Sequence, residues 1–152
     1  MKTNIRLLLT MWLAAIFAIA TSGEIRAQES AEDKPFAEAH IVLQLSDQER
    51  ESVVLDVANN LIKHYGGPDF VDIEIVTFGP GVRLLFAESQ HESRIASLVD
   101  NGVRFYICEN TLDTMERTHG SRPKVNPKAL SVQTGVARIV EQVKEGYILV
   151  RP

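Results

Sequence analysis

Residues 101–112 read Asn-Gly-Val-Arg-Phe-Tyr-Ile-Cys-Glu-Asn-Thr-Leu and contain the pattern from which the fold class follows. Asn101-Gly102 is typical of the end of a helix, and the apolar run at 103–107 is typical of a buried strand. A second helix is expected after Cys108, with Asn110 or Thr111 as its N-cap. The stretch therefore predicts a strand between two helices, the repeating unit of an α/β fold.

The segment upstream shows the same alternation. The apolar run at 41–45 predicts a buried strand. The next residues, Ser46-Asp47-Gln48-Glu49, predict a helix start in which Ser46 and Glu49 are reciprocal capping partners. Apolar residues then recur at helical spacing up to Tyr65, and Gly66-Gly67-Pro68 is expected to end this helix.

The remaining segments complete the pattern. Further strands are predicted at 71–78, 129–132 and 147–150, a short helix at 82–87, and helices after Ser89 and after Thr134. In the last helix, Val136, Ile139, Val140 and Val143 are expected to form one apolar face. Right-handed crossovers between such units predict a three-layer α/β/α sandwich with a mainly parallel sheet of about five strands.

The N-terminal 27 residues are typical of a Sec-type signal peptide. Lys2 and Arg6 precede a short, mainly apolar run at 7–20, and Ala27 is the expected last residue of the peptide. The Ala-rich run indicates a bacterial protein exported to the periplasm. We expect a flexible polar leader at 28–39 and one domain at 40–152, which has no segment apolar enough to cross a membrane.

Composition and motifs argue against several classes of function. The formal charge of −4 becomes more negative after residues 1–27, because these residues hold three cations and one anion. Such an acidic domain is not expected to bind nucleic acid. No cofactor is expected, since no glycine-rich phosphate loop follows the first strand. The four histidines lack the spacing of metal ligands, so no metal site is predicted.

Cys108 is the only cysteine in the chain and is the main candidate for chemistry. It follows a predicted strand, and ligands of α/β proteins collect at the carboxyl ends of strands. Backbone amides at the helix start near Asn110 and Thr111 would favour an anionic sulfur. Arg117 and Arg122, in the basic segment that follows, could guide an anionic donor. The neighbouring charge of Glu109 opposes this effect.

The segment Gly102-Val103 to Cys108, followed by Glu109-Asn110-Thr111-Leu112, resembles the DsrE/DsrF-like superfamily. The Gly79-Pro80-Gly81-Val82 turn and the closing segment from Gly135-Val136 to Gly146-Tyr147 also resemble its small single-domain members. The resemblance spans about residues 40–152. It implies a three-layer α/β domain that forms homo-oligomers, often trimers or hexamers. It also implies that the cysteine matching Cys108 accepts sulfur as a persulfide and passes it to a partner.

Three interpretations stay open at this point. The first is a periplasmic sulfurtransferase or sulfur carrier, with Cys108 as the nucleophile and with a donor or acceptor that is a protein or a small sulfur compound. The second is a non-catalytic oligomeric binding or scaffold module, because a free cysteine is often a packing residue. The third is a thiol redox sensor. Export itself departs from the cytoplasmic relay proteins of this superfamily.

Overall fold

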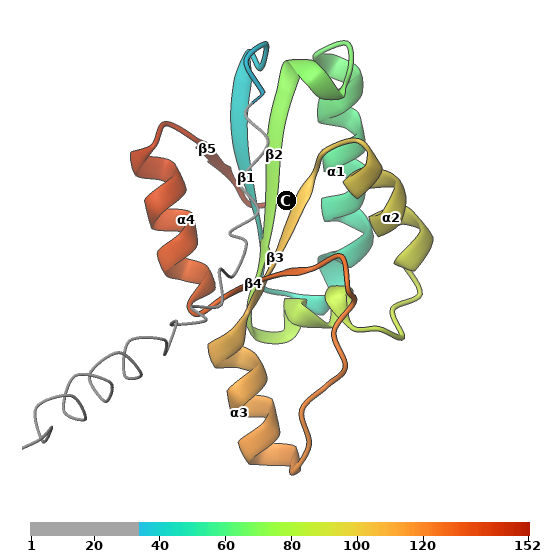
Figure 1. Cartoon of the computed structure of the whole chain (residues 1–152), viewed down its shortest axis with the longest axis vertical. Coiled ribbons are helices and arrows are strands. Elements are labelled where there is room, and N and C mark those ends of the chain that lie inside the picture. The colour runs from blue at the N-terminus through green and yellow to red at the C-terminus, as the bar shows by residue number, and fades with distance from the viewer. Residues whose placement is uncertain (1–33) are drawn as a thin grey trace, which may run out of the picture. The chain divides into compact units, whose positions relative to one another are not determined.

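The computed structural model of the protein describes residues 34–152 (Figure 1). The predicted signal peptide at 1–27 and the first part of the predicted leader, residues 28–33, lie outside these residues. The strands are β1 (Ala39–Leu45), β2 (Val71–Thr77), β3 (Arg104–Cys108), β4 (Leu130–Val132) and β5 (Ile148–Val150). The α-helices are α1 (Glu51–His64), α2 (Glu92–Asp100), α3 (Glu109–His119) and α4 (Gly135–Lys144). The 3-10 helices are η1 (Gln48–Arg50), η2 (Pro68–Phe70) and η3 (Gly79–Leu85).

The five strands form one all-parallel sheet in the order β4-β3-β2-β1-β5. The first four strands are added in one direction, so right-handed crossovers place α1 and α2 on the same face of the sheet. The chain then returns from β4 to β5 at the opposite end, and α4 covers the other face on the way (Figure 1). The predicted α/β/α sandwich with a parallel five-stranded sheet is confirmed.

The two faces of the sheet differ in chemistry. The face under α1 and α2 carries the main hydrophobic core, to which β1, β2 and β3 contribute residues such as Leu43, Ile75 and Phe105. The face under α4 has a small apolar cluster built on Val42, Val76, Tyr106 and Ile139. Buried Asp72 and Glu74 lie on β2, whose other residues are apolar except for Thr77. Polar chemistry in the sheet is therefore concentrated on the α4 side.

The start of α1 differs from the prediction. Ser46 and Glu49 do not form the expected capping box. Instead, Asp47 Oδ1 accepts a hydrogen bond from the Glu49 amide at 3.0 Å and caps η1. This extra 3-10 turn takes up residues 48–50, so α1 begins only at Glu51. The short helix predicted at 82–87 is likewise a 3-10 helix and begins earlier, at Gly79.

The turn after β2 packs directly on the end of β1. A Cβ atom on Gly81 would lie 2.5 Å from the carbonyl oxygen of Leu45, so only glycine fits at this position. The Phe78 amide also donates a hydrogen bond to the Leu45 carbonyl at 3.1 Å. These contacts bring the carboxyl ends of β1 and β2 together beside the start of α3.

The last helix corrects another expectation. Of the four residues predicted to form its apolar face, only Ile139 is buried, whereas Val136, Val140 and Val143 are exposed. The residues of α4 that are buried are Gly135, Ile139 and Gln142. Polar Gln142 is accommodated because the sheet face below α4 carries charged side chains.

Candidate functional site

Cys108 lies at the junction of β3 and α3. It is the last residue of the strand and the residue that precedes the first turn of the helix. Because strand side chains alternate, Cys108 shares the α4 face of the sheet with Tyr106, whereas Phe105 and Ile107 point into the main core. The structure therefore places Cys108 at the carboxyl edge of the sheet, as predicted.

The thiol is buried beneath the segment that leads into α4. Cys108 is 5% exposed, and a Cβ atom on Gly135 would lie 3.4 Å from Cys108 Cβ and 3.3 Å from Phe78 Cβ. The sulfur donates a hydrogen bond to the Gln133 carbonyl oxygen at 3.8 Å. Residues 133–135 thus form a cover over the thiol, and Gly135 leaves no side chain between the helix start and the sulfur.

The start of α3 differs from the prediction in its capping. The helix begins at Glu109, directly after Cys108, so neither Asn110 nor Thr111 is its N-cap. The sulfur makes no capping hydrogen bond to the amides of α3. The physical reason is the direction of the side chain, which bonds to Gln133 on the neighbouring segment instead.

Asn110 holds the cover in place. Its amide donates to the Gln133 carbonyl at 3.1 Å, and its side chain accepts from Gln133 Nε2 at 2.7 Å and donates to Thr134 Oγ1 at 2.9 Å. Both side-chain bonds are exposed to water. Asn110 therefore acts on Cys108 indirectly, through the segment that closes over the sulfur.

Thr111 belongs to a separate depression between α3, η1 and η3. This depression of about 600 Å³ is lined by Gln48, Gly79, Pro80, Arg83, Asn110, Thr111, Thr114 and Met115. Thr111 Oγ1 accepts a hydrogen bond from the Gly79 amide at 3.1 Å and so joins α3 to the turn after β2. Cys108 does not line the depression, so Thr111 and the thiol do not share a cavity.

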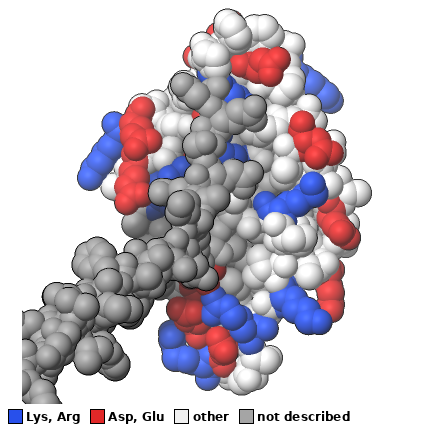
Figure 2. Space-filling model, viewed as in Figure 1, with Lys and Arg blue, Asp and Glu red and all other residues white. Residues whose placement is uncertain are grey.

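The two predicted arginines are engaged on α3. Arg117 donates to Thr114 Oγ1 at 2.8 Å. Arg122 pairs with Glu109, with Asp113 at 2.5 Å and with Glu116 at 3.4 Å. These three carboxylates more than offset the charge of Arg122, which is also the cation paired with Glu109 next to Cys108. On the face shown in Figure 2, acidic and basic side chains are similarly intermixed.

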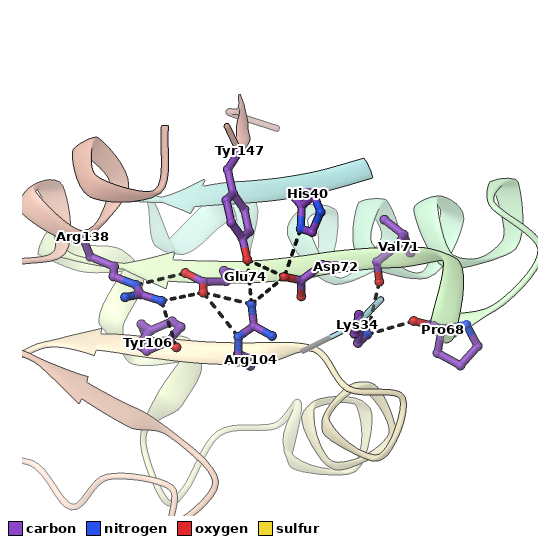
Figure 3. Close-up of polar contacts among 10 residues, drawn as sticks. All are labelled: Lys34, His40, Pro68, Val71, Asp72, Glu74, Arg104, Tyr106, Arg138 and Tyr147. Atoms are coloured by element: carbon purple, nitrogen blue, oxygen red, sulfur yellow. Dashed lines mark hydrogen bonds and ion pairs between the residues drawn. The ribbon is translucent and has the colours of Figure 1, made fainter. Parts of the chain in front are cut away.

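A buried charged cluster on the α4 face was not found from the sequence (Figure 3). We call the group Asp72, Glu74, Arg104, Arg138 and Tyr147 the β2 charge cluster. Arg104 Nη2 lies 2.9 Å from Asp72 Oδ2 and 3.0 Å from Glu74 Oε1. Arg138 from α4 donates to Glu74 at 2.6 Å and 3.1 Å. The cluster therefore links α4 to two adjacent strands.

Tyr147 and His40 extend the cluster to β1 and β5. The Tyr147 hydroxyl, just before β5, donates to Asp72 Oδ2, and His40 Nδ1 lies 3.4 Å from the same oxygen. Burial raises the pKa of Asp72, but hydrogen bonds from Arg104 and Tyr147 outweigh it, so this pKa lies below its ordinary value. Burial and the Asp72 carboxylate raise the pKa of Tyr147. The hydroxyl thus remains a donor at neutral pH.

The cluster has the chemistry of a structural ion-pair network. Its two carboxylates and two guanidinium groups balance in charge, and Arg138 also stacks over Tyr106 with its guanidinium carbon 4.6 Å from the ring centroid. The cluster could have been predicted from Asp72 and Glu74, two acidic residues that lie two positions apart inside the apolar segment 71–78. Alternation puts both on one face, where buried carboxylates need cationic partners.

Residues 34–152 contain neither a candidate metal site nor a helix that could span a membrane. No group of three or more His, Cys, Asp or Glu side chains in this part of the chain is arranged to hold a metal ion. None of the helices formed by these residues is long and apolar enough to cross a membrane. The thiol of Cys108, the depression beside Thr111 and the β2 charge cluster are features of this region that could take part in binding or chemistry.

Comparison with known proteins supports the fold. The chain matches no protein-family model and none of the curated proteins. It is similar to the solved structure of MTH1491 from Methanobacterium thermoautotrophicum, a protein of unknown function, with a TM-score of 0.64 and 28% identity. That match covers 76% of this chain and 100% of the other. BT1422 from Bacteroides thetaiotaomicron, also of unknown function, matches with a TM-score of 0.50, 13% identity and coverage of 74% and 94%, respectively. The second likeness shows the α/β fold alone.

Proposed function

We propose that this protein is a periplasmic sulfur carrier that holds sulfur as a persulfide on Cys108. The observation that carries the proposal is the position of the thiol at the carboxyl end of β3, between the first residues of α3 and α4. Parallel sheets commonly bind their ligands at this edge. Two helix N-termini beside one sulfur would favour an anionic persulfide.

The chemistry of the carrier is a pair of displacement reactions at sulfur. The Cys108 thiolate attacks the sulfane sulfur of a donor such as thiosulfate, so that a new S–S bond forms and the donor S–S bond breaks. Sulfite leaves with the bonding electron pair. An acceptor thiolate then attacks the outer sulfur of the persulfide and releases the Cys108 thiolate. No external oxidant or reductant is consumed in this cycle.

Access to the sulfur requires movement of residues 133–135. The thiol is 5% exposed, and its bond to the Gln133 carbonyl exists only while the sulfur carries a proton. Loss of that proton removes one bond that holds the cover. The other side-chain bonds of the cover, made by Asn110, are exposed to water and are therefore weak. A partner that binds this edge can displace the segment.

Location and assembly complete the proposal. The charged and apolar pattern of residues 1–27 supports export to the periplasm. We expect the carrier to form homo-oligomers and to exchange sulfur with a donor or acceptor that is a protein or a small sulfur compound. The β2 charge cluster has a structural part in this scheme, since it fixes α4, whose first residues cover the thiol.

The test is formation of a persulfide on the purified protein. After incubation with thiosulfate or polysulfide and removal of the reagent, cyanide should release close to one equivalent of thiocyanate per chain. Cys108→Ser should release none. Asn59→Ala is the control, because Asn59 lies on α1, away from the thiol, and this variant should match the wild type. Absence of cyanide-labile sulfur with both reagents would contradict the proposal.

The burial of Cys108 favours a second candidate, a non-catalytic oligomeric scaffold in which the cysteine is a packing residue. The two candidates differ in how the thiol reacts with iodoacetamide. The carrier requires alkylation of the folded protein, with a rate that rises with pH as the thiolate forms. Alkylation that begins only when denaturant unfolds the chain would favour the scaffold.

A further inference from the structure

The depression beside Thr111 lies at the carboxyl end of the sheet. Its lining comes from the three segments that follow β1, β2 and β3, namely η1, η3 and the first two turns of α3. η1 packs against η3, and α3 begins at the same end of the sheet (Figure 1). The volume of about 600 Å³ lies in the range of small-molecule sites, about 300–1,000 Å³. Parallel sheets commonly bind their ligands at this end.

Contacts within the chain hold the three segments together. The Gly79 amide donates a hydrogen bond to Thr111 Oγ1 at 3.1 Å, which ties η3 to α3. Gly81 packs so closely on Leu45 that a Cβ atom would lie 2.5 Å from the Leu45 carbonyl oxygen, which ties η3 to the end of β1. The depression is therefore already formed without a ligand, and this lowers the entropic cost of binding.

Each of the three segments brings one hydrogen-bond donor to the depression. η1 provides the carboxamide of Gln48, η3 the guanidinium group of Arg83, and α3 the hydroxyl of Thr111. The oxygen of this hydroxyl accepts its bond from Gly79, so its own proton remains available to a ligand. Within residues 34–152, neither the Gln48 nor the Arg83 side chain forms a hydrogen bond or a close ion pair. Three donors with unused capacity thus meet in one depression.

The depression carries a positive charge. Of the described residues that line it, only Arg83 is charged, and the acidic residues that flank Gln48 in the chain do not line it. Arg83 attracts Glu51, but this carboxylate is buried outside the depression, with its Oε2 atom 3.6 Å from His91 Nε2. A negative group of a ligand would therefore meet a guanidinium group with no competing carboxylate in the lining, and such charge-assisted hydrogen bonds are strong.

We propose that this depression binds a small organic oxyanion, either a carboxylate or a phosphate ester. Arg83 pairs with the negative group, and Gln48 and Thr111 donate hydrogen bonds to it. The carbon skeleton of the ligand lies against Pro80 and Met115, which complete the lining with apolar surface. Cys108 does not line the depression, so this inference goes beyond the sulfur chemistry and does not depend on it.

The first experiment measures the binding of phenyl phosphate, which combines an oxyanion with an apolar ring, by isothermal titration calorimetry on the purified protein. We expect saturable binding with a Kd below about 1 mM. Arg83→Gln should weaken this binding by about tenfold or more. Arg50→Gln is the matched control, because Arg50 is an exposed arginine of η1 that lines a different depression, and this variant should bind as the wild type does. No binding, or equal losses in the two variants, would overturn the inference.

Further probes separate the parts of the ligand. Inorganic phosphate carries only the charge and benzyl alcohol only the ring, so each should bind at least about fivefold more weakly than phenyl phosphate. Equal affinity for inorganic phosphate would show attraction of charge only and would overturn the organic ligand. Comparison of benzoate with phenyl phosphate decides between a carboxylate and a phosphate ester.

NMR spectroscopy tests the location of the bound probe. Phenyl phosphate should shift the amide signals of residues 79–83 and 111–115, and shifts confined to other segments would overturn the assignment. Cys108→Ser should bind phenyl phosphate as the wild type does. Since this binding and thiocyanate release are separate measurements, failure of the oxyanion site and failure of the sulfur proposal are distinguishable.

Discussion

The sulfur of Cys108 lies 3.8 Å from the carbonyl oxygen of Gln133, so the thiol donates a hydrogen bond to the segment that covers it. The same carbonyl accepts a hydrogen bond from the Asn110 amide. One backbone oxygen thus joins the end of β3, the start of α3 and the segment before α4. Any reaction at this thiol depends on how often that junction opens.

Asn110→Ala is expected to make Cys108 more accessible. The substitution removes two side-chain bonds to the cover but keeps the backbone bond to Gln133. A loss of about 1 kcal/mol corresponds to an increase of about fivefold in the alkylation rate under native conditions. Asn59→Ala removes a comparable side-chain bond on α1 and should leave the rate unchanged. Equal rates for Asn110→Ala and the wild type would show that Asn110 does not control access.

Gly81→Ala is expected to destabilise the fold. The new methyl group would lie 2.5 Å from the Leu45 carbonyl oxygen, and the end of β1 cannot yield as a flexible side chain would. We expect the free energy of unfolding to fall by at least about 2 kcal/mol, as measured by urea denaturation. Gly120→Ala is the control, since that site is open and only its positive φ of 78° opposes the change. Its cost should be about 1 kcal/mol.

Glu74→Gln tests the β2 charge cluster. Glu74 is fully buried and forms ion pairs with both Arg104 and Arg138. Loss of its charge therefore leaves two guanidinium groups with one negative partner fewer. The free energy of unfolding should fall by about 3 kcal/mol. Asp56→Asn breaks the exposed pair with Arg94 and should cost less than about 1 kcal/mol. A similar small effect for both variants would show that the cluster contributes little to stability.

Asp72 should make stability fall in acid. Its pKa in the folded protein is below the ordinary 3.8, so the unfolded chain binds the proton more readily. The stabilisation is complete above about pH 5 and is lost as the pH falls through the folded-state pKa. Thermal unfolding of wild type and Asp72→Asn between pH 6 and 3 measures this. The difference between them should shrink with falling pH, and a constant difference would contradict the assignment.

Glu51 should change the stability of the fold with pH in the direction opposite to Asp72. Burial raises the pKa of this carboxyl, against the opposing fields of His91 and Arg83, and its Oε1 atom is buried without a hydrogen bond. The folded protein therefore binds this proton more readily than the unfolded chain, and stability falls as the pH rises above 4.5 through the folded-state pKa. Glu51→Gln should remove this loss, so that its urea midpoint relative to the wild type is higher at pH 7 than at pH 4.5.

The local sequence pattern was sufficient to predict the central strands and several helix ends. Apolar runs at 41–45, 71–78 and 103–107 marked the central strands, and glycines such as Gly66-Gly67 and Gly102 marked helix ends. The reason is physical: each signal depends on residues close together in the chain. The handedness of crossovers then restricts the topology to a parallel sheet with helices on both faces.

The structure of the site depended on contacts between distant segments. The cover over Cys108 comes from residues 133–135, about 25 positions further along the chain. No local pattern predicts that the Gln133 carbonyl will accept a hydrogen bond from the thiol. The same holds for Arg138, which reaches Glu74 from a helix more than 60 residues away. Helical spacing placed Val136 and Ile139 on one apolar face, but only packing against the sheet decided which of the two is buried.

By itself, therefore, the sequence determined an α/β sandwich and a single thiol at the end of a central strand. The tertiary structure alone decided that this thiol is covered, that charged residues of β2 fix α4, and that one row of valines remains exposed. Periodicity reports which residues can share a face. Burial and pairing depend on which segments meet across the sheet, and those meetings join residues that are far apart in the chain.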